Sequence, residues 1–483
     1  MVGLQARNWF GDITSSPAVI VYPRSVDELV EIVRDRARYP SPVRAVGSNH
    51  STTLCGTADG GTLVVMRYMD RILHIGPDSV TAEAGALYID VSHELQRHGL
   101  QFNVNIEIGN LTIGSAACGG TKEASMPGEL GQVCSYASAI KMVSPEGELI
   151  EFDEGRPELL QVARSSYGLF GIIYEVTFKA RPLQSMAVYH ETYTLEAFGR
   201  QLPALKARDE SIMLYLNPFL DTVTVEFRRY REDADPRKAS RWQWRLRNYV
   251  WATLAPFYSY AVVKYVPIPL LRDALIDRFY ALIDLILVRA IKSGNTLASD
   301  QTIRYPEIST NSRYTFSIWA FPEETYIQAL TDYYAFCRSY YRSKKFRCNM
   351  PNVGYRIARD QGSLLSYSFN GPVMTFDPVS TGSPGWEAFL QGYNEFASAH
   401  DGVPLFNQSH GLTREQVTRA FGERLATFEE HRHRFDPDER FLNPYFREFL
   451  QEARRPSVGP TSELPSQPPT DRRRQPHGYH APD

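Results

Sequence analysis

Residues 43–51 read VRAVGSNHS, and this stretch decides how the amino-terminal part of the chain folds. A run rich in β-branched residues ends at Gly47, passes two small polar residues and reaches His50 and Ser51. Successive amide groups in such a turn can point inward and bind an anion, and small side chains let a phosphate approach the backbone. The stretch predicts a phosphate-binding loop, whereas so short a motif taken alone is more often a surface turn.

The residues before this loop predict a strand, a helix and a second strand. An apolar run, AVIVYP, begins at Ala18, and Val26, Leu29, Val30 and Val33 then fall on one face of a helix. The glycine turn leads on into further strand-like runs instead of a helix, and the sequence holds no GxGxxG fingerprint. Both features disfavour a nicotinamide-binding Rossmann fold.

The pattern beyond the loop continues to residue 182. Residues 79–100 predict a strand and then an amphipathic helix. Residues 110–152 predict a loop rich in small residues and two strands joined by a Pro-Glu-Gly turn, and residues 166–182 end in another strand. We therefore expect one α+β domain over residues 1–182.

The second half predicts a different architecture. Residues 211–230 and 313–322 read as strands of an antiparallel sheet, so residues 183–400 form a second domain. Between them, residues 241–292 are rich in Trp, Tyr, Leu and Ile but are broken by prolines, and a bilayer span needs about 20 continuous apolar residues. This segment predicts either a helical cover over the sheet or an interfacial patch in which arginines alternate with aromatic residues.

The carboxyl-terminal part predicts one long helix and a tail. Thr413 is positioned to cap a helix that runs to about Arg434 and ends at a Phe-Asp-Pro turn. The last 33 residues, 451–483, hold seven prolines and few apolar side chains, which predicts disorder.

Composition limits the possible partners. The 483 residues carry 52 basic and 55 acidic side chains, a net charge of −3, which offers no general attraction to nucleic acid. Five cysteines without CxxC spacing predict neither a metal site nor a disulfide framework, and they fit a reducing, cytoplasmic compartment. The expected partner is a small molecule.

A set of short motifs, in a characteristic order, resembles the vanillyl-alcohol oxidase superfamily. These flavoproteins have a PCMH-type FAD-binding domain, and within the superfamily the chain is most similar to the aldonolactone and alditol oxidases. The motifs are NWFGDI from Asn8, PxSxxEL from Pro23, RxxGxxHS from Arg44, VxxEAG from Val80, LxxHGL from Leu95, TIGxxxxGGT from Thr112, SYGLFGII from Ser166 and FDPxxxFLNPY from Phe435.

The resemblance implies an α+β fold in two parts: a PCMH-type FAD-binding domain over residues 1–182, and an antiparallel-sheet cap over residues 183–400 that covers the substrate. Residues 401–450 would return to the FAD site, ahead of the tail. The cap would contain the apolar helical insertion at 241–292.

The resemblance also implies which residues contact FAD. The loop around Gly47 would hold the pyrophosphate, a second loop after Thr112 would approach the flavin and ribityl chain, and residues near the end of the domain would contact the flavin or adenine side. The implied cofactor residues are Val46, Gly47, Ser48, Asn49, His50, Ser51, Gly114, Ser115, Cys118, Gly119, Gly120, Thr121, Ile172, Ile173 and Asn443.

Two of these side chains are candidates for a covalent bond. In relatives, a histidine at the position of His50 can bond to the 8α-methyl group of the flavin, which raises the oxidising power and retains the cofactor. The alternative is that His50 packs beside a dissociable flavin. Cys118 is a second candidate, but a packed thiol is the favoured interpretation because free cysteines are usually buried.

The chain departs from its sugar-oxidising relatives at the substrate. Where they carry a lysine beside the flavin, this chain has Gln408, and of their Glu-x-Arg strand only Arg304 remains. Oxidation of an alcohol needs a group to take the hydroxyl proton and a cation to stabilise the reduced flavin. Arg304 is the candidate cation, and His410, Tyr355 or Tyr314 is the candidate acceptor. Each has a structural alternative: an ion pair for the arginine, a core position for Tyr355 and a helix-start contact for His410.

Together these features predict an FAD-dependent oxidoreductase that oxidises a CH–OH group by hydride transfer to the flavin, with oxygen or another electron acceptor as the second substrate. The alternative is a flavoenzyme that acts on a lipid or lipid-linked substrate at the inner membrane face, which the aromatic segment and the missing lysine favour. A third possibility is a flavin-binding protein without catalysis.

Overall fold

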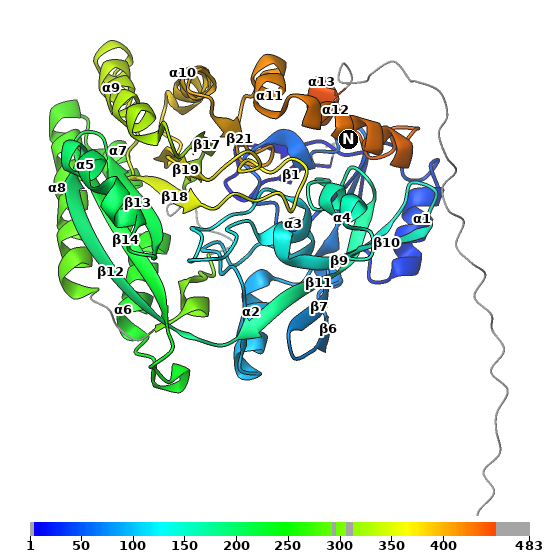
Figure 1. Ribbon diagram of the computed structural model, residues 1–483. Helices are drawn as coiled ribbons and strands as arrows, with labels where there is room; N and C mark the ends of the chain where they lie inside the picture. The colour runs from blue at the N-terminus through cyan, green and yellow to red at the C-terminus, as the bar shows by residue number, and fades with distance from the viewer. Residues whose placement is uncertain (1–3, 292–295, 306–312, 451–483) are drawn as a thin grey trace, which may run out of the picture.

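The computed structural model describes residues 4–291, 296–305 and 313–450, and the predicted tail lies outside these residues. Figure 1 shows two lobes side by side: one, blue to cyan, is built from the amino-terminal third, and the other, green to yellow, from the middle of the chain. The orange carboxyl-terminal helices lie along the top of the molecule in that view.

A small parallel sheet carries the phosphate-binding loop. Strand β3 (Val19–Val21), helix α1 (Val26–Arg34) and strand β4 (Val43–Val46) follow in the predicted order, and Leu29 is fully buried. The next strand, β5 (Thr62–Val65), lies between β3 and β4 and is parallel to both. The loop after β4 therefore leaves from an edge strand.

A second, antiparallel sheet completes this lobe and follows the sequence prediction closely. The strand order is β10-β9-β11-β7-β6, and β8 also pairs with β11. Helix α2 (Tyr88–Arg97) follows β7, and helix α4 (Pro157–Ala163) follows β10. The strands are β6 (Ile72–Ile75), β7 (Ser79–Glu83), β8 (Leu100–Phe102), β9 (Ala137–Val143), β10 (Leu149–Asp153) and β11 (Ile172–Pro182).

The other lobe is built on the predicted antiparallel sheet, which has eight strands among the described residues in the order β15-β12-β14-β13-β18-β19-β17-β21. The last of these comes from beyond residue 400, so the carboxyl-terminal segment also extends the sheet. The strands are β12 (Ser185–Thr194), β13 (Ser211–Asn217), β14 (Thr222–Arg231), β15 (Thr296–Leu297), β17 (Trp319–Pro322), β18 (Asn352–Ile357), β19 (Val373–Thr375) and β21 (Val403–Pro404).

Helices cover both faces of this sheet, which explains why every residue of β13 is buried. Because side chains alternate along a strand, Ile212 and Leu214 belong to the main hydrophobic core, whereas Met213 and Tyr215 point to the other face. Helices α5 (Leu195–Lys206), α9 (Tyr326–Lys344) and α10 (Trp386–Ala399) contribute apolar side chains to the main core.

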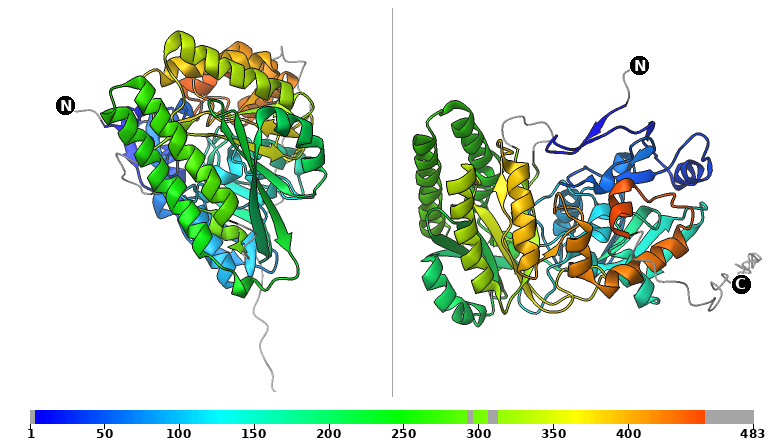
Figure 2. Two further views of the ribbon diagram at one scale, coloured as in Figure 1. Left: turned by 90° about the vertical axis from the view of Figure 1, so that its left-hand side faces the viewer. Right: turned by 90° about the horizontal axis from the view of Figure 1, so that it is seen from above.

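The aromatic insertion forms helices on the opposite face, as the first of the two interpretations predicts. They are α6 (Trp242–Tyr249), a π-helical turn (Val250–Leu254), α7 (Ala255–Tyr265) and α8 (Pro269–Ala290). Figure 2, left, shows α7 and α8 side by side on the outside of the lobe. Within the described ranges, no helix is both long and apolar enough to cross a bilayer.

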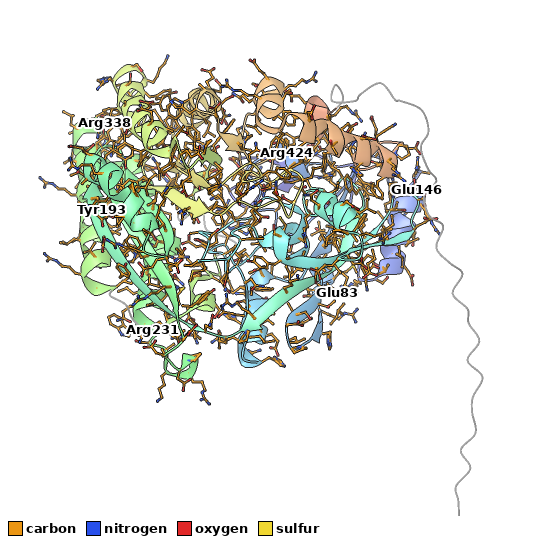
Figure 3. The ribbon with its side chains drawn as sticks, in the orientation of Figure 1. Glu83, Glu146, Tyr193, Arg231, Arg338 and Arg424 are labelled. Carbon is orange, nitrogen blue, oxygen red and sulfur yellow. The ribbon has the colours of Figure 1, made fainter. Side chains whose placement is uncertain are left out.

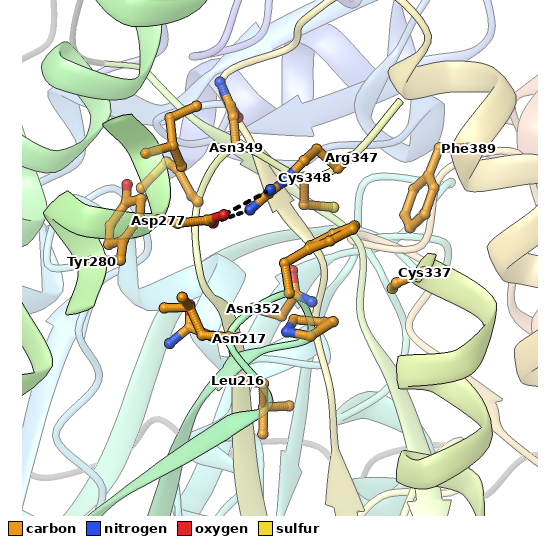
Figure 4. A pocket seen from close by; sticks show the side chains of 15 residues that line it. Leu216, Asn217, Asp277, Tyr280, Cys337, Arg347, Cys348, Asn349, Asn352 and Phe389 are labelled. Carbon is orange, nitrogen blue, oxygen red and sulfur yellow. Dashed lines mark hydrogen bonds and ion pairs between the residues drawn. The ribbon is translucent and has the colours of Figure 1, made fainter. Parts of the chain in front are cut away.

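The insertion is tied to the rest of the lobe by charged as well as apolar contacts. A small cavity of about 440 Å³ separates α8 and α9 from one end of the sheet. Figure 4 shows Arg347 reaching across it to Asp277 of α8, with 3.2 Å between Nη1 and Oδ2. The guanidinium also lies 3.9 Å from the centre of the Phe219 ring.

The carboxyl-terminal helix differs from the prediction. Thr413 caps a helix through the backbone of Gln416, but α11 (Arg414–Phe421) ends after two turns and α12 (Glu423–Phe435) starts again. The break falls at Gly422, whose φ is +53°, a conformation that glycine adopts easily. Helix α13 (Pro444–Leu450) follows.

Helix α12 also fastens the two lobes together. Figure 3 labels Arg424, whose Nη1 donates to the carbonyls of Leu364 and Ser366 at 2.9 and 2.8 Å. Since Leu364 N in turn donates to the carbonyl of Gln161, the loop after β18 is held against both α12 and α4.

Candidate active site

A cleft of about 1070 Å³ opens beside the loop after β4. Twelve of the fifteen predicted cofactor residues line it, together with Gln408. The twelve are Val46, Gly47, Ser48, Asn49, His50, Ser51, Gly114, Ser115, Cys118, Gly119, Thr121 and Ile173.

The loop itself is held in place by hydrogen bonds at both ends. Asn49 has a φ of +55°, its carbonyl accepts from Trp9 N at 2.8 Å, and its Nδ2 donates to the carbonyl of Arg7 at 3.0 Å. The hydroxyl of Ser48 donates to the carbonyl of Asn110. Asn49 and Ser48 thus connect the loop to the amino terminus and to the second predicted loop.

Glycine lets the two predicted loops meet. A Cβ atom added to Gly47 would lie 2.1 Å from Thr112 Oγ1, and one added to Gly114 would lie 2.8 Å from Ala84 Cβ. Gly114 lies in helix α3 (Ile113–Cys118), which begins directly after Thr112. The small residues therefore allow backbone segments to approach each other around the cleft, as expected for a loop that closes on a ligand.

The carboxyl-terminal segment completes the wall. Ser51 Oγ donates to the carbonyl of Asn407 at 2.7 Å, Thr52 Oγ1 to the carbonyl of Gln408 at 3.0 Å, and Thr53 Oγ1 to the carbonyl of Phe406 at 2.7 Å. Three consecutive side chains of one loop thereby fix three consecutive residues that lie about 350 positions away in the chain.

Two side-chain acceptors in this wall are left without a protein partner. Asn407 Oδ1 and Gln408 Oε1 are buried, and neither has a hydrogen-bond partner among the described residues. Both residues line the cleft. Because a buried acceptor without a donor is unfavourable by about 1–3 kcal/mol, a ligand with N–H or O–H groups fits here.

His50 lies at one end of the cleft and stacks on Trp9, with 5.2 Å between ring centres and 22° between planes. Burial lowers the pKa of His50 to about 4. The imidazole is therefore neutral at physiological pH and keeps a nitrogen lone pair, which a nucleophile requires. No other described residue hydrogen-bonds to its ring, so its contacts leave both nitrogens available.

Cys118, unlike His50, is not in a nucleophilic form. Burial raises the pKa of its thiol to about 12, and Cys118 accordingly stays protonated at neutral pH. Thiolates, not thiols, are the nucleophilic form. The favoured interpretation of Cys118 as a packed thiol is therefore consistent with its surroundings.

Three predicted cofactor residues lie behind the wall. Gly120 packs against Leu405, and Ile172 is fully buried in the core. Asn443 donates from Nδ2 to the carbonyls of Leu54 and Thr57 at 3.1 and 3.0 Å, and so supports the turn that follows the loop. These three residues do not line the cleft but lie behind the residues that do.

A second pocket of about 610 Å³ adjoins the cleft, and both are lined by Ile108, Thr121 and Gln408. Its lining combines apolar residues with several polar and charged ones. The polar and charged residues are Glu107, Thr121, Lys122, Glu123, Tyr314, Tyr355, Asp377 and Gln408. Of these, Glu107, Lys122, Glu123 and Asp377 were not predicted from the sequence.

The two predicted tyrosines, Tyr355 and Tyr314, lie in this second pocket. Burial raises the pKa of Tyr355 and Tyr314 well above that of an ordinary phenol. Both phenols therefore remain protonated and can donate a hydrogen bond to a substrate oxygen. Lys122 Nζ lies 3.8 Å from the centre of the Tyr355 ring.

Arg304 lies away from both pockets. Residues 303–304 are extended, and neighbouring side chains on an extended segment point to opposite sides, so Ile303 is buried while the Arg304 side chain is 48% exposed. Arg304 forms an ion pair with Asp90 on α2. The structure thus gives this arginine the ion-pair role that was the alternative to catalysis.

His410 is also outside the lining of both pockets. Its Nδ1 lies 3.3 Å from the carbonyl of Thr52, and its own carbonyl accepts from Asn394 Nδ2 at 2.8 Å. It therefore helps to hold the segment before α11, which agrees with the helix-start alternative.

Comparison with known proteins assigns this site to a class. Residues 17–153 match the family described as FAD binding domain, so the chain is an FAD-binding flavoprotein of the PCMH type. Residues 176–449 match the family described as D-arabinono-1,4-lactone oxidase. The chain therefore belongs to the D-arabinono-1,4-lactone oxidase family.

Full-length relatives agree with this assignment. The chain is 24% identical to L-gulonolactone oxidase of Mus musculus over 454 residues, which cover 92% of this chain and 97% of the relative. It is 23% identical to L-gulono-1,4-lactone dehydrogenase of Mycobacterium tuberculosis over 456 residues, which cover 92% and 98%.

Solved structures show the same fold. A solvent-stable cholesterol oxidase superposes with a TM-score of 0.70 at 17% identity over 92% of this chain and 97% of the other. Cholesterol oxidase from Brevibacterium sterolicum gives a TM-score of 0.68 at 16% identity, with 92% and 96% covered. At such identity the likeness concerns the fold alone.

These findings confirm the predicted class. The chain is an FAD-dependent oxidoreductase that oxidises a CH–OH group. Bound FAD supplies a two-electron oxidant for this chemistry, and the residues of the cleft fit it: a lining loop of small residues and buried acceptors without a partner among the described residues. Among the residues that the structure describes, no group of three or more potential ligands is placed to hold a metal ion.

Proposed function

We propose that the chain oxidises a secondary hydroxyl group of a small, sugar-like lactone or polyol in the pocket that adjoins the cleft. The observation that supports this most is the shared wall: Gln408 and Thr121 line both spaces, so a substrate in the pocket can reach a flavin in the cleft. Polar side chains in the pocket suit a substrate with several hydroxyl groups, and two relatives are named for lactone oxidation.

Gln408 takes a binding role in this proposal. It stands where sugar-oxidising relatives carry lysine, and its buried Oε1 lacks a partner among the described residues. An amide oxygen can accept a hydrogen bond from a substrate hydroxyl, but it supplies no positive charge. Tyr355 and Tyr314 donate to other substrate oxygens.

Anaerobic mixing tests the proposal directly. The protein with bound FAD would be mixed with L-gulono-1,4-lactone, D-arabinono-1,4-lactone or xylitol, and the flavin absorbance would be followed. Bleaching by one of them that slows at least tenfold in Gln408→Ala is the expected result. If none bleaches the flavin while a lipid alcohol does, the sugar-like substrate is wrong.

The second candidate is a lipid-linked substrate at a membrane surface, and a specific feature favours it. Twelve large apolar side chains of the insertion are exposed, including Leu270 at 80% and Tyr265 at 71%. The twelve are Trp242, Leu246, Tyr249, Leu254, Phe257, Tyr265, Ile268, Leu270, Leu271, Leu282, Leu285 and Ile286. We call them the insertion surface.

The exposed charges of the insertion indicate which lipids the insertion surface would bind. Of the seven basic residues in 241–291, Arg247 is buried in ion pairs, Arg241 is paired with Asp300 and Arg272 lies beside Asp273. The exposed basic residues are Arg245, Lys264, Arg278 and Arg289. Asp273 and Asp284 are buried, and Asp277 is paired with Arg347. Apolar and cationic side chains together are typical of proteins that bind anionic lipid.

Pelleting with vesicles tests this surface. We expect the protein to pellet with phosphatidylglycerol vesicles and less with phosphatidylcholine vesicles, because the charges attract anionic lipid. A double substitution, Leu270→Glu with Leu271→Glu, would abolish pelleting. Leu73→Glu with Leu149→Glu is the matched control, since both leucines are exposed outside the insertion. An equal loss of pelleting in both variants, or no pelleting of the wild type, would exclude membrane binding by the insertion surface.

Three finer points belong to the same proposal. His50 bonds covalently to FAD, supported by its neutral imidazole at the end of the cleft.

The division of the chain into domains at residues 182 and 400 is supported by β11, which ends at Pro182 before β12 begins at Ser185. A cytoplasmic location, peripheral to the inner membrane face, is supported by the cysteine usage and by the insertion surface.

A further inference from the structure

The strongest unassigned feature of the substrate pocket is a buried ion pair. Lys122 Nζ lies 2.9 Å from Asp377 Oδ2, and the two side chains are 3% and 4% exposed. Building such a pair into a pocket wall is unfavourable unless its remaining hydrogen-bonding groups are satisfied, because both charges leave water. A purely structural pair would be expected to satisfy both carboxylate oxygens.

One oxygen of this carboxylate is not satisfied. Asp377 Oδ1 is buried without a hydrogen-bond partner among the described residues, and Asp377 lines the pocket. The unpaired oxygen is therefore an acceptor without a donor, on a residue that lines the pocket.

We infer that Asp377 takes the proton of the reacting substrate hydroxyl and that Lys122 holds its carboxylate ionised and in position. The inference rests on the proposed function, since it places the reacting hydroxyl in this pocket. Asp377 is a catalytic residue in this scheme, and Lys122 is a positioning residue.

The backbone holds Asp377 rigidly. Its N–H donates to the carbonyl of Val353 at 2.6 Å, and its carbonyl accepts from Val353 N at 3.0 Å. Asp377 follows β19 by two residues, whereas Lys122 follows the Gly-Gly-Thr loop beside the cleft. The pair thus connects the cap sheet to the cofactor loop, so the acceptor lies where the two lobes meet.

All three carboxylates of the pocket are ion-paired, and of these Asp377 is the one with a buried oxygen that lacks a partner among the described residues. Glu107 is paired with Arg247 at 3.1 Å and Glu123 with Arg228 at 3.3 Å. Titratable groups that face Asp377 or share its pocket are Glu107, Lys122, Glu123, Tyr314, Tyr326, Tyr355, Tyr367 and Tyr393. The phenols of this set remain protonated because burial raises their pKa.

Titration supports the same role. Burial raises the pKa of Asp377 to about 6, and Lys122 and, to a smaller extent, the Thr375 side chain oppose that rise. A carboxylate with such a pKa is ionised at neutral pH yet basic enough to accept a proton during the reaction.

The substrate O–H bond breaks and its proton bonds to Asp377 Oδ1. The C–H bond on the same carbon breaks and its electron pair leaves as hydride, for which FAD is the oxidant of the established activity. A C=O bond forms, so the substrate loses two electrons and two hydrogens, and the proton on Asp377 later passes to solvent.

Three variants of the FAD-loaded protein test the inference. Asp377→Asn should keep the flavin and reduce it about 10²–10⁴-fold more slowly with substrate, the usual range for a lost acid–base group. Lys122→Met should move the acid limb of kcat/KM, which lies near pH 6 in the wild type, to higher pH. Asp360→Asn is the matched control, because Asp360 is also a buried carboxylate with a raised pKa, bonded to Ser135 outside the pocket.

Infrared difference spectroscopy supplies a measurement independent of turnover. A protonated carboxyl band of Asp377 should appear as the pH falls through about 6 in the wild type and in Asp360→Asn. Because burial also raises the pKa of Asp284 to about 7, that residue adds a band in all three proteins, and the band of Asp377 is the component missing in Asp377→Asn. Persistence of that band in Asp377→Asn, or flavin reduction at the wild-type rate with an unmoved acid limb, would overturn the inference. If no lactone or polyol reduces the wild-type flavin, the proposed function fails instead, and the infrared result still decides whether Asp377 titrates as required.

Discussion

The guanidinium of Arg247 lies 3.1 Å from the carboxylate of Glu107, which joins helix α6 of the insertion to the wall of the second pocket. The same guanidinium donates to the hydroxyl of Tyr215 at 2.6 Å and lies 3.4 Å from Glu226. The insertion is therefore more than an outer cover, because one of its residues reaches the interior where the two lobes meet.

Replacing Arg247 should destabilise the whole protein. In Arg247→Met, Glu107 loses its partner, and removing one member of a buried pair typically costs about 3–5 kcal/mol. Denaturant unfolding would measure the loss. Arg245→Met is the control, since Arg245 is exposed on the same helix and surface substitutions usually change stability by less than about 0.5 kcal/mol. Equal stability of the two variants would contradict the interior role of Arg247.

His50→Ala should release the flavin from the polypeptide. Because no other neutral imidazole lines the cleft in the described part of the chain, we expect the wild-type protein to gain the mass of FAD and to stay yellow after acid precipitation. His50→Ala should lose both properties, and His74→Ala, an exposed histidine on β6, should keep them. A colourless wild-type pellet would exclude the covalent bond but not FAD binding.

Gly47→Ala should separate the two cofactor loops. The new methyl group would lie within 2.1 Å of Thr112 Oγ1, and overpacking of this kind costs about 1–3 kcal/mol. We expect roughly tenfold weaker FAD binding or more, measured by fluorescence titration of protein produced without flavin. Gly371→Ala is the control, because a Cβ there meets no atom within 4 Å. Unchanged affinity in Gly47→Ala would mean that the loops need not touch.

The pKa of His50 predicts a pH dependence of stability in protein without flavin. Its pKa is about 4 when folded and about 6.5 when unfolded, so the unfolded chain binds the extra proton between these values. Stability from this group is complete above pH 6.5 and is lost as the pH falls toward 4. The loss amounts to about 3 kcal/mol at most.

The comparison with His50→Ala isolates this contribution, because other carboxylates titrate in the same range. The difference in unfolding free energy between the two proteins should shift in favour of the variant from pH 6.5 to pH 4. A constant difference over that range would show that the folded imidazole titrates normally.

Local pattern was enough to predict the elements and the cofactor loops. Alternating apolar residues and glycine turns predicted β3, β4, β7, β9, β10 and β11 in their order along the chain but missed the short strand β8, and twelve of fifteen predicted cofactor residues line the cleft. The exposure of Arg304 could not be predicted from local pattern. Neighbouring side chains on an extended segment point to opposite sides, so a shift of one residue decides whether the arginine points inward or to solvent. The break at Gly422 was missed because the apolar pattern continues on both sides of it.

The sequence by itself determined the class of this protein: the small residues around Gly47 and Gly114 specify close backbone approach, and that requirement is local to each loop. Only the tertiary structure decided the make-up of the second pocket. Lys122 and Asp377 are 255 residues apart, and their pairing follows from the docking of the cap sheet on the cofactor loop. A buried charge is tolerated only beside its partner. Which partner it meets depends on how distant segments pack together, and no local sequence pattern predicts that packing.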